Sequence, residues 1–141
     1  MTHVRIASAA EALLPYCRPW SGRVQDPCFT TYAEMTVFAA GIGYWKARGA
    51  EVAACSDFIE NTQPYPIDFS VFKSPTLYPI VLMLGLVTCK SRNAVADDER
   101  LARALEDYSA IGFSEMKNRL ASTTPTEFHI ELAELLLKAS A

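Results

Sequence analysis

Apolar residues recur along most of the chain at the three- and four-residue spacing of amphipathic helices. In one stretch, Met35, Phe38 and Ile42 fall on a single helical face. The pattern predicts five helices, over residues 8–18, 31–48, 75–90, 97–121 and 125–139. The first of these contains Pro15, where we expect it to end or kink.

Helix starts are marked by side chains that can accept hydrogen bonds from the first free backbone N–H groups. Three sites have a hydroxyl residue followed three positions later by glutamate, which is the pattern of a reciprocal capping box. They are Ser8 with Glu11, Thr31 with Glu34, and Thr124 with Glu127. Two further starts lie at Ser74-Pro75 and at the acidic run that begins with Asp97. Each predicted helix therefore has its own start signal.

The helix predicted over 75–90 differs from the others in being apolar nearly all round. A helix of that composition is expected at the centre of a bundle, and Pro79 is expected to delay its start until Tyr78. The apolar run from Leu77 to Cys89 has 13 residues, whereas a membrane crossing needs about 20. We therefore expect a buried helix.

The remaining segments carry weaker patterns. Residues 67–70 alternate apolar and polar side chains, but no partner strand is evident, so we expect an extended segment laid across the core. The stretches 19–29 and 50–66 are interpreted as loops, and the second is long enough to be mobile or to contact a partner. The predicted fold is all-α, a compact bundle of about five helices forming a single domain over 1–141, with room for one short extended segment.

Composition and charge narrow the classes of function. The chain has 141 residues, of which 50% are hydrophobic and 21% charged, and this excludes a disordered or low-complexity protein. The net charge of −3 gives no overall positive field to attract nucleic acid or an anionic membrane. The opening residues lack the apolar core of a secretory signal, so we expect a cytoplasmic protein. Its four cysteines are far apart in sequence and are expected to be reduced thiols.

Two glycines, Gly41 and Gly43, lie inside the helix predicted over 31–48. Each costs roughly 1 kcal/mol relative to alanine in a helix interior, so their presence needs a reason. A phosphate-binding glycine loop would follow a strand, but the residues before this pair are themselves helical. We expect the missing side chains to allow close approach of another helix.

Catalytic and metal-binding chemistry finds little support in the sequence. His3 and His129 belong to no group with metal-ligand spacing, and His3 lies in what we expect to be a loosely held terminus. A distant cysteine–histidine nucleophile pair is open in principle but has no specific signal. The carboxylates Glu106 and Asp107 are interpreted as solvated residues on a helix surface. We therefore predict a protein that is not an enzyme and needs no cofactor.

Basic residues cluster modestly and allow a nucleic-acid interpretation. The candidate contacts are Arg18, Arg23, Lys46, Arg48, Lys90 and Arg92. Four of these six lie at or just beyond predicted helix ends, where cations also satisfy the last carbonyl groups. The acidic residues after position 97 would oppose DNA. Direct DNA binding is therefore the weaker alternative.

A protein interface is the stronger expectation from the residues. Exposed aromatic residues and arginine are concentrated at interfaces. The candidate contacts are Tyr16, Trp20 and Arg23, together with the loop 50–66.

Two stretches carry a resemblance to a known family. Residues 29–44 read FTTYAEMTVFAAGIGY and residues 106–113 read EDYSAIGF. With the apolar helix between them, they resemble the small proteins associated with bacterial DNA phosphorothioation (Dnd) systems, over roughly 29–120. The resemblance implies work in an antiviral restriction-modification setting, where sulfur replaces a non-bridging phosphate oxygen of DNA, and it carries over no catalytic residue.

Together these observations predict a non-enzymatic accessory or adaptor protein that binds protein subunits of a phosphorothioation or restriction complex. The alternative is a DNA-binding or transcription-regulating module of the same system. An enzyme is the third hypothesis, and a homodimer is compatible with the apolar helices near the end of the chain.

Overall fold

The computed structural model describes residues 2–20, 27–48, 50, 52–89 and 97–121, and the separate positions 130, 133, 134 and 137. The elements in chain order are β1 (His3–Val4), the 3₁₀ helix η1 (Ser8–Tyr16), α1 (Tyr32–Ala47), β2 (Ile67–Asp68), the 3₁₀ helix η2 (Phe69–Lys73), α2 (Tyr78–Cys89) and α3 (Asp98–Ala121). The α-helices confirm the predictions over 31–48, 75–90 and 97–121. Most of the helix predicted over 125–139 lies outside the described residues, and the four described positions there are helical.

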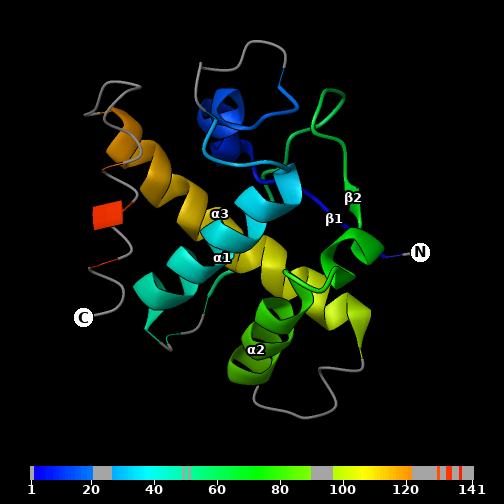
Figure 1. Cartoon of the computed structure of the whole chain (residues 1–141). Coiled ribbons are helices and arrows are strands. Elements are labelled where there is room, and N and C mark those ends of the chain that lie inside the picture. The colour runs from blue at the N-terminus through cyan, green and yellow to red at the C-terminus, as the bar shows by residue number, and fades with distance from the viewer. Residues whose placement is uncertain are drawn as a thin grey trace.

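The α1 and α3 helices cross at the middle of the molecule and form its scaffold (Figure 1). At the crossing, a Cβ atom on Gly43 would overlap the backbone carbonyl of Tyr108, and one on Gly112 would overlap the carbonyl of Ala39. Only residues without side chains allow this approach. The interpretation of Gly43 as a close-packing residue is confirmed, whereas a Cβ on Gly41 would meet nothing within 4 Å.

The predicted capping residues are found at two helix starts, although the Glu34 carboxylate accepts from the Thr30 N–H (2.9 Å) and not from that of Thr31. The Thr31 hydroxyl accepts a hydrogen bond from the Glu34 N–H at 3.1 Å at the start of α1. The Asp97 carboxylate accepts from the N–H groups of Glu99 (3.1 Å) and Arg100 (3.3 Å) at the start of α3. The pair Thr124 and Glu127 lies outside the described residues.

The capping box predicted at Ser8 and Glu11 is wrong. The residue before the first turn is Ala7, which makes no side-chain cap, and the Ser8 hydroxyl instead donates to Asp57 at 2.8 Å. The segment forms a 3₁₀ helix that contains Pro15 and ends at Tyr16. Because Ser8 is the first residue inside the helix and Ala7 precedes it, the serine does not occupy the capping position that the box requires.

A small sheet corrects the all-α prediction. β1 and β2 pair in antiparallel register, with His3 opposite Asp68 and Val4 opposite Ile67. The N–H of Phe69 also donates to the Thr2 carbonyl at 2.9 Å. The partner strand that the sequence did not reveal is the N-terminal segment, so His3 is held in the sheet and is not part of a loose terminus.

The prediction that the helix over 75–90 is central is also wrong. The two hydrophobic clusters both draw on α1 and α3, and α2 lies to one side of them (Figure 1). α2 contacts α3 through Val81 and Leu84, and a Cβ on Gly85 would overlap the side chain of Leu101. Its opposite side is left to solvent. None of the helices within the described ranges is long and apolar enough to cross a membrane.

Candidate functional site

An exposed apolar surface lies on the side of α2 that faces away from α3. Four large apolar side chains on it are exposed: Ile80 (49%), Met83 (65%), Leu86 (44%) and Val87 (46%). They fall within two helical turns, and α2 contains no charged residue. We call these four residues the outer face of α2. Exposed contiguous apolar surface on a soluble protein marks a contact surface more often than scattered single residues do.

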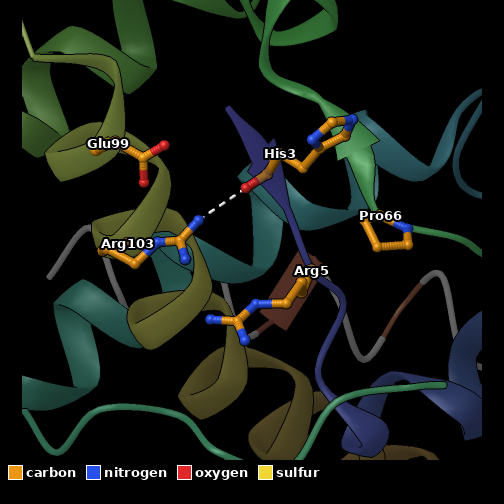
Figure 2. A pocket seen from close by; sticks show the side chains of 5 residues that line it. All are labelled: His3, Arg5, Pro66, Glu99 and Arg103. Atoms are coloured by element: carbon orange, nitrogen blue, oxygen red, sulfur yellow. Dashed lines mark hydrogen bonds between the residues drawn. The ribbon is translucent and has the colours of Figure 1, made fainter. Parts of the chain in front are cut away.

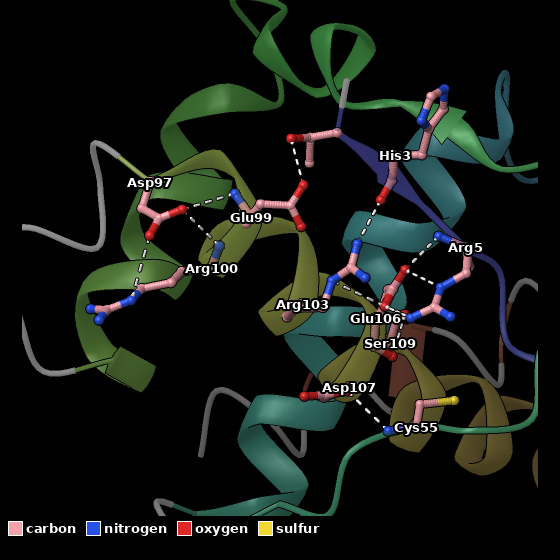
Figure 3. Close-up of polar contacts among 11 residues, drawn as sticks. His3, Arg5, Cys55, Asp97, Glu99, Arg100, Arg103, Glu106, Asp107 and Ser109 are labelled. Atoms are coloured by element: carbon pink, nitrogen blue, oxygen red, sulfur yellow. Dashed lines mark hydrogen bonds and ion pairs between the residues drawn. The ribbon is translucent and has the colours of Figure 1, made fainter.

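An ion pair between an exposed arginine and a buried carboxylate ties the N-terminal segment to α3 (Figure 3). The Glu106 carboxylate is 1% exposed and accepts three hydrogen bonds from Arg5: from its backbone N–H (2.8 Å), Nε (3.0 Å) and Nη2 (3.0 Å). This fork-to-carboxylate geometry satisfies both oxygens of a carboxylate removed from water. The interpretation of Glu106 as a solvated surface residue is therefore wrong.

Further groups hold this pair in place. The Nε of Arg103 lies 3.3 Å from Glu106, and its Nη2 donates to the His3 carbonyl at 2.8 Å. The Arg5 guanidinium lies over the Phe58 ring, 4.0 Å from its centroid. Hydrogen bonding to Glu106 raises the pKa of Arg5 above its ordinary value.

The neighbouring carboxylate, Asp107, anchors the loop 50–66. It accepts from the Cys55 N–H at 3.0 Å, and its burial raises the pKa of the carboxyl. The Ile59 N–H donates to the Ile6 carbonyl at 2.8 Å, and Ile59 is buried. The loop is therefore fastened to the core at both points. The Arg5–Glu106 contact joins residues 101 positions apart, so no local spacing in the sequence could have revealed it.

A surface pocket of about 480 Å³ lies beside this cluster (Figure 2). It is lined by His3, Arg5, Pro66, Glu99 and Arg103. Figure 2 shows Arg103 extending from α3 and Arg5 extending from the end of β1, with their guanidinium groups close to one another. The pocket thus places two arginines where the N-terminal strand meets α3.

The interface residues predicted from the sequence occupy different environments. Tyr16 is only 4% exposed, so its ring is not available to a partner as the prediction required. Trp20 is partly buried and packs against the core, and Arg23 lies outside the described residues. The buried position of Tyr16 follows from the pairing of Cys17 with Phe29, which folds this segment against the start of α1.

Three of the predicted nucleic-acid contacts, Arg18, Lys46 and Arg48, lie among the residues the structure describes. Lys46 pairs with Glu115 on α3. Arg48 follows the last residue of α1, has a left-handed backbone conformation, and lies over the Trp45 ring, 5.3 Å from its centroid. Arg18 is exposed. The other three candidates, Arg23, Lys90 and Arg92, lie outside the described residues.

Of the cysteines whose side chains the structure describes, Cys17 is buried and Cys28 and Cys55 are partly buried, and none of these three forms a disulfide. Burial raises the pKa of Cys17 to about 12 and that of Cys28 to about 11. Their thiolates, the reactive forms, are therefore disfavoured near neutral pH. Within the described part of the chain, no three His, Cys, Asp or Glu side chains are grouped so as to hold a metal ion.

Comparison with known proteins identifies the family. A family model described as DNA sulphur modification system-associated protein 4 matches residues 3–140. The chain belongs to this family. The membership confirms the resemblance seen at 29–44 and 106–113, and it associates the chain with a DNA sulphur modification system. No curated protein and no solved structure gives a significant match.

In this family member the second of those stretches is largely structural. Glu106 and Asp107 anchor two distant segments, Gly112 permits the helix crossing, and Phe113 is fully buried. The residues that carry the resemblance thus account for how α3 joins the rest of the fold.

Proposed function

We propose that this protein is a non-enzymatic accessory subunit that binds another protein of a DNA sulphur modification system through the outer face of α2. Family membership supplies the setting. The observation that carries the proposal is the exposure of Ile80, Met83, Leu86 and Val87 on a helix without charge. A partner that covers these side chains with its own apolar surface would remove them from water, which is the main driving force of protein association.

The chemistry of the described side chains supports a binding role over catalysis. The most buried carboxylate, that of Glu106, is fully engaged by Arg5, and the Asp107 carboxylate holds a loop. The thiols of Cys17 and Cys28 are held in their protonated forms. The two carboxylates therefore have structural roles that account for their positions.

The DNA-binding alternative has less support. Lys46 is paired with a carboxylate, and the chain has a net charge of −3. Phosphate contacts dominate the affinity of proteins for DNA, and they require cations that are available. Capture of DNA in the absence of a protein partner would favour this alternative.

Native co-purification from a host that carries a DNA sulphur modification system tests the proposal. The tagged chain is compared with the double variant Ile80→Lys/Met83→Lys after nuclease treatment, and captured proteins are identified by mass spectrometry. The control is Val71→Lys, which places one of the two added charges at an exposed apolar residue (47%) of η2.

The proposal expects a subunit of the system to be captured by the wild-type chain and by Val71→Lys and to be lost from the double variant. Loss of capture in all variants after nuclease treatment would transfer support to the DNA-binding alternative. Retention by the double variant would overturn the assignment of the outer face of α2. The size of each purified variant in solution is also measured. A dimer of the wild-type chain that the double variant does not form would show that a second copy of the chain covers the outer face of α2.

A further inference from the structure

We propose that the pocket between β1 and α3 binds a small molecule through an oxyanion, a carboxylate or a phosphate group, held by Arg5 and Arg103. The pocket is an open surface depression of about 480 Å³, which can admit a small molecule. This binding site is independent of the outer face of α2 and goes beyond the protein-contact function proposed above.

The two guanidinium groups are held in place before any ligand arrives. Arg5 is fixed by two side-chain bonds to Glu106 and by the Phe58 ring on its face. Arg103 is fixed by its bond to the His3 carbonyl and by its proximity to Glu106. Side chains fixed in this way lose little conformational entropy on binding, which favours recognition of a ligand.

Both arginines retain hydrogen-bonding capacity after these contacts. A guanidinium has five N–H donors, and Arg5 uses two of them on Glu106. Arg103 uses one donor on His3, and its Nε–H is buried and faces Glu106, so the donors that it keeps for a ligand are on its two terminal nitrogens. The remaining donors belong to two neighbouring guanidinium groups, and guanidinium groups suit the oxygens of a carboxylate or phosphate.

The charges around the pocket favour a small anion over a polyanion. Arg5, Arg103 and Glu106 together carry one net positive charge, and the carboxylate of Glu99 on the pocket wall brings the sum of the four groups to zero. Glu99 accepts a hydrogen bond from the Thr2 hydroxyl at 2.9 Å, which holds it beside the pocket. A single oxyanion can contact the arginines, whereas an extended chain of phosphates would also approach Glu99.

The test follows the side-chain Nε–H signals of the full-length protein by NMR during titration with inorganic phosphate and, separately, with acetate at constant ionic strength. A saturable shift of the Arg103 signal with either anion is expected. A preference for phosphate or for acetate identifies the tetrahedral or the planar group as the ligand chemistry. The absence of saturable binding with both anions would overturn the proposal.

Matched variants separate a built site from a general charge effect. Arg103→Gln is expected to weaken binding about tenfold, because a charge-assisted hydrogen bond is lost. Arg100→Gln makes the same charge change on an exposed residue of α3 that does not line the pocket, and it should stay within about twofold of the wild type. Equal weakening by both variants would contradict the site.

A second variant keeps the test decisive where Arg103→Gln fails to fold. Glu99→Gln preserves an acceptor for Thr2 and removes the opposing charge. It is expected to tighten binding of the anion about threefold, the scale of one exposed charge pair. An unchanged or weaker affinity in the folded Glu99→Gln protein would contradict the placement of the anion in this pocket.

Discussion

The α1 and α2 helices are both strongly apolar, yet the molecule uses them in opposite ways. α1 is enclosed and has buried side chains on most of its length, and its Gly43 lets it cross α3 in backbone contact. α2 rests on α3 along one side only and leaves Ile80 and Met83 in solvent. Hydrophobic composition therefore does not decide burial, because burial depends on which neighbouring surface each side of a helix meets.

The difference separates a scaffold from a contact surface. The crossing of α1 and α3, with the ion pair between Arg5 and Glu106, holds together segments that are far apart in sequence. The outer face of α2 adds little to that scaffold. The comparison predicts that changes at the crossing alter stability, whereas changes on the outer face alter binding.

The largest loss of stability is expected from Gly112→Ala. The added Cβ would overlap the carbonyl of Ala39, so backbone must move. The free energy of unfolding should fall by an amount at or above the upper end of the roughly 1–3 kcal/mol that is typical of overpacking. Chemical denaturation measures it. The control Gly41→Ala meets no atom within 4 Å and should be stabilising by up to about 1 kcal/mol. Similar losses in both variants would contradict the crossing.

The ion pair should respond asymmetrically to loss of each partner. Arg5→Met leaves the buried Glu106 carboxylate with only Arg103 nearby, and we expect a loss of about 3 kcal/mol. Glu106→Gln leaves an arginine that is 45% exposed and can be hydrated, so its loss should be smaller, about 1–2 kcal/mol. Denaturation of both single variants and the double variant measures this difference. A larger loss for Glu106→Gln would show that the carboxylate is not the buried partner.

Two leucines allow the same substitution, leucine to alanine, to be compared on the buried side and on the exposed side of α2. Leu84→Ala removes a buried side chain and should cost about 2 kcal/mol. Leu86→Ala changes a residue that is 44% exposed and should cost less than about 1 kcal/mol. Thermal or chemical unfolding of the isolated protein gives both values. Equal costs would mean that the outer face of α2 is covered.

The smallest expected effect concerns the pH dependence set by Asp107. Burial raises the pKa of this carboxyl above its ordinary value of 3.8. Protonation therefore favours the folded state, and this contribution is lost as the pH rises through the folded-state pKa. Asp107→Asn keeps an acceptor for Cys55 and removes the titration. Its stability relative to the wild type should improve as pH rises from acid to neutral, as measured by denaturation at each pH. A relative stability that falls over that range would contradict the shift.

Local signals in the sequence were sufficient for much of the helical structure. Apolar spacing and the caps at Thr31 and Asp97 place α1 and α3 close to their observed bounds, and Pro79 near the start of α2 agrees with its beginning at Tyr78. These features depend on residues a few positions apart, whose interactions a sequence displays directly.

Long-range contacts account for what the sequence did not reveal. β1 and β2 are two residues long each and pair across most of the N-terminal half of the chain. Arg5 and Glu106 are 101 positions apart in sequence. The residues near Glu106 in the sequence therefore gave no sign that its side chain is buried. An all-round apolar helix such as α2 likewise contains no internal mark of which side stays exposed.

Site-specific photo-crosslinking in the native host tests the central claim most directly. A photoreactive amino acid replaces Met83 in one strain and Arg18, an exposed residue of the segment that the sequence favoured, in another. The account predicts a nuclease-resistant crosslink from position 83 to a protein subunit of the DNA sulphur modification system and none from position 18. A crosslink from position 18 to such a subunit, with none from position 83, would contradict it.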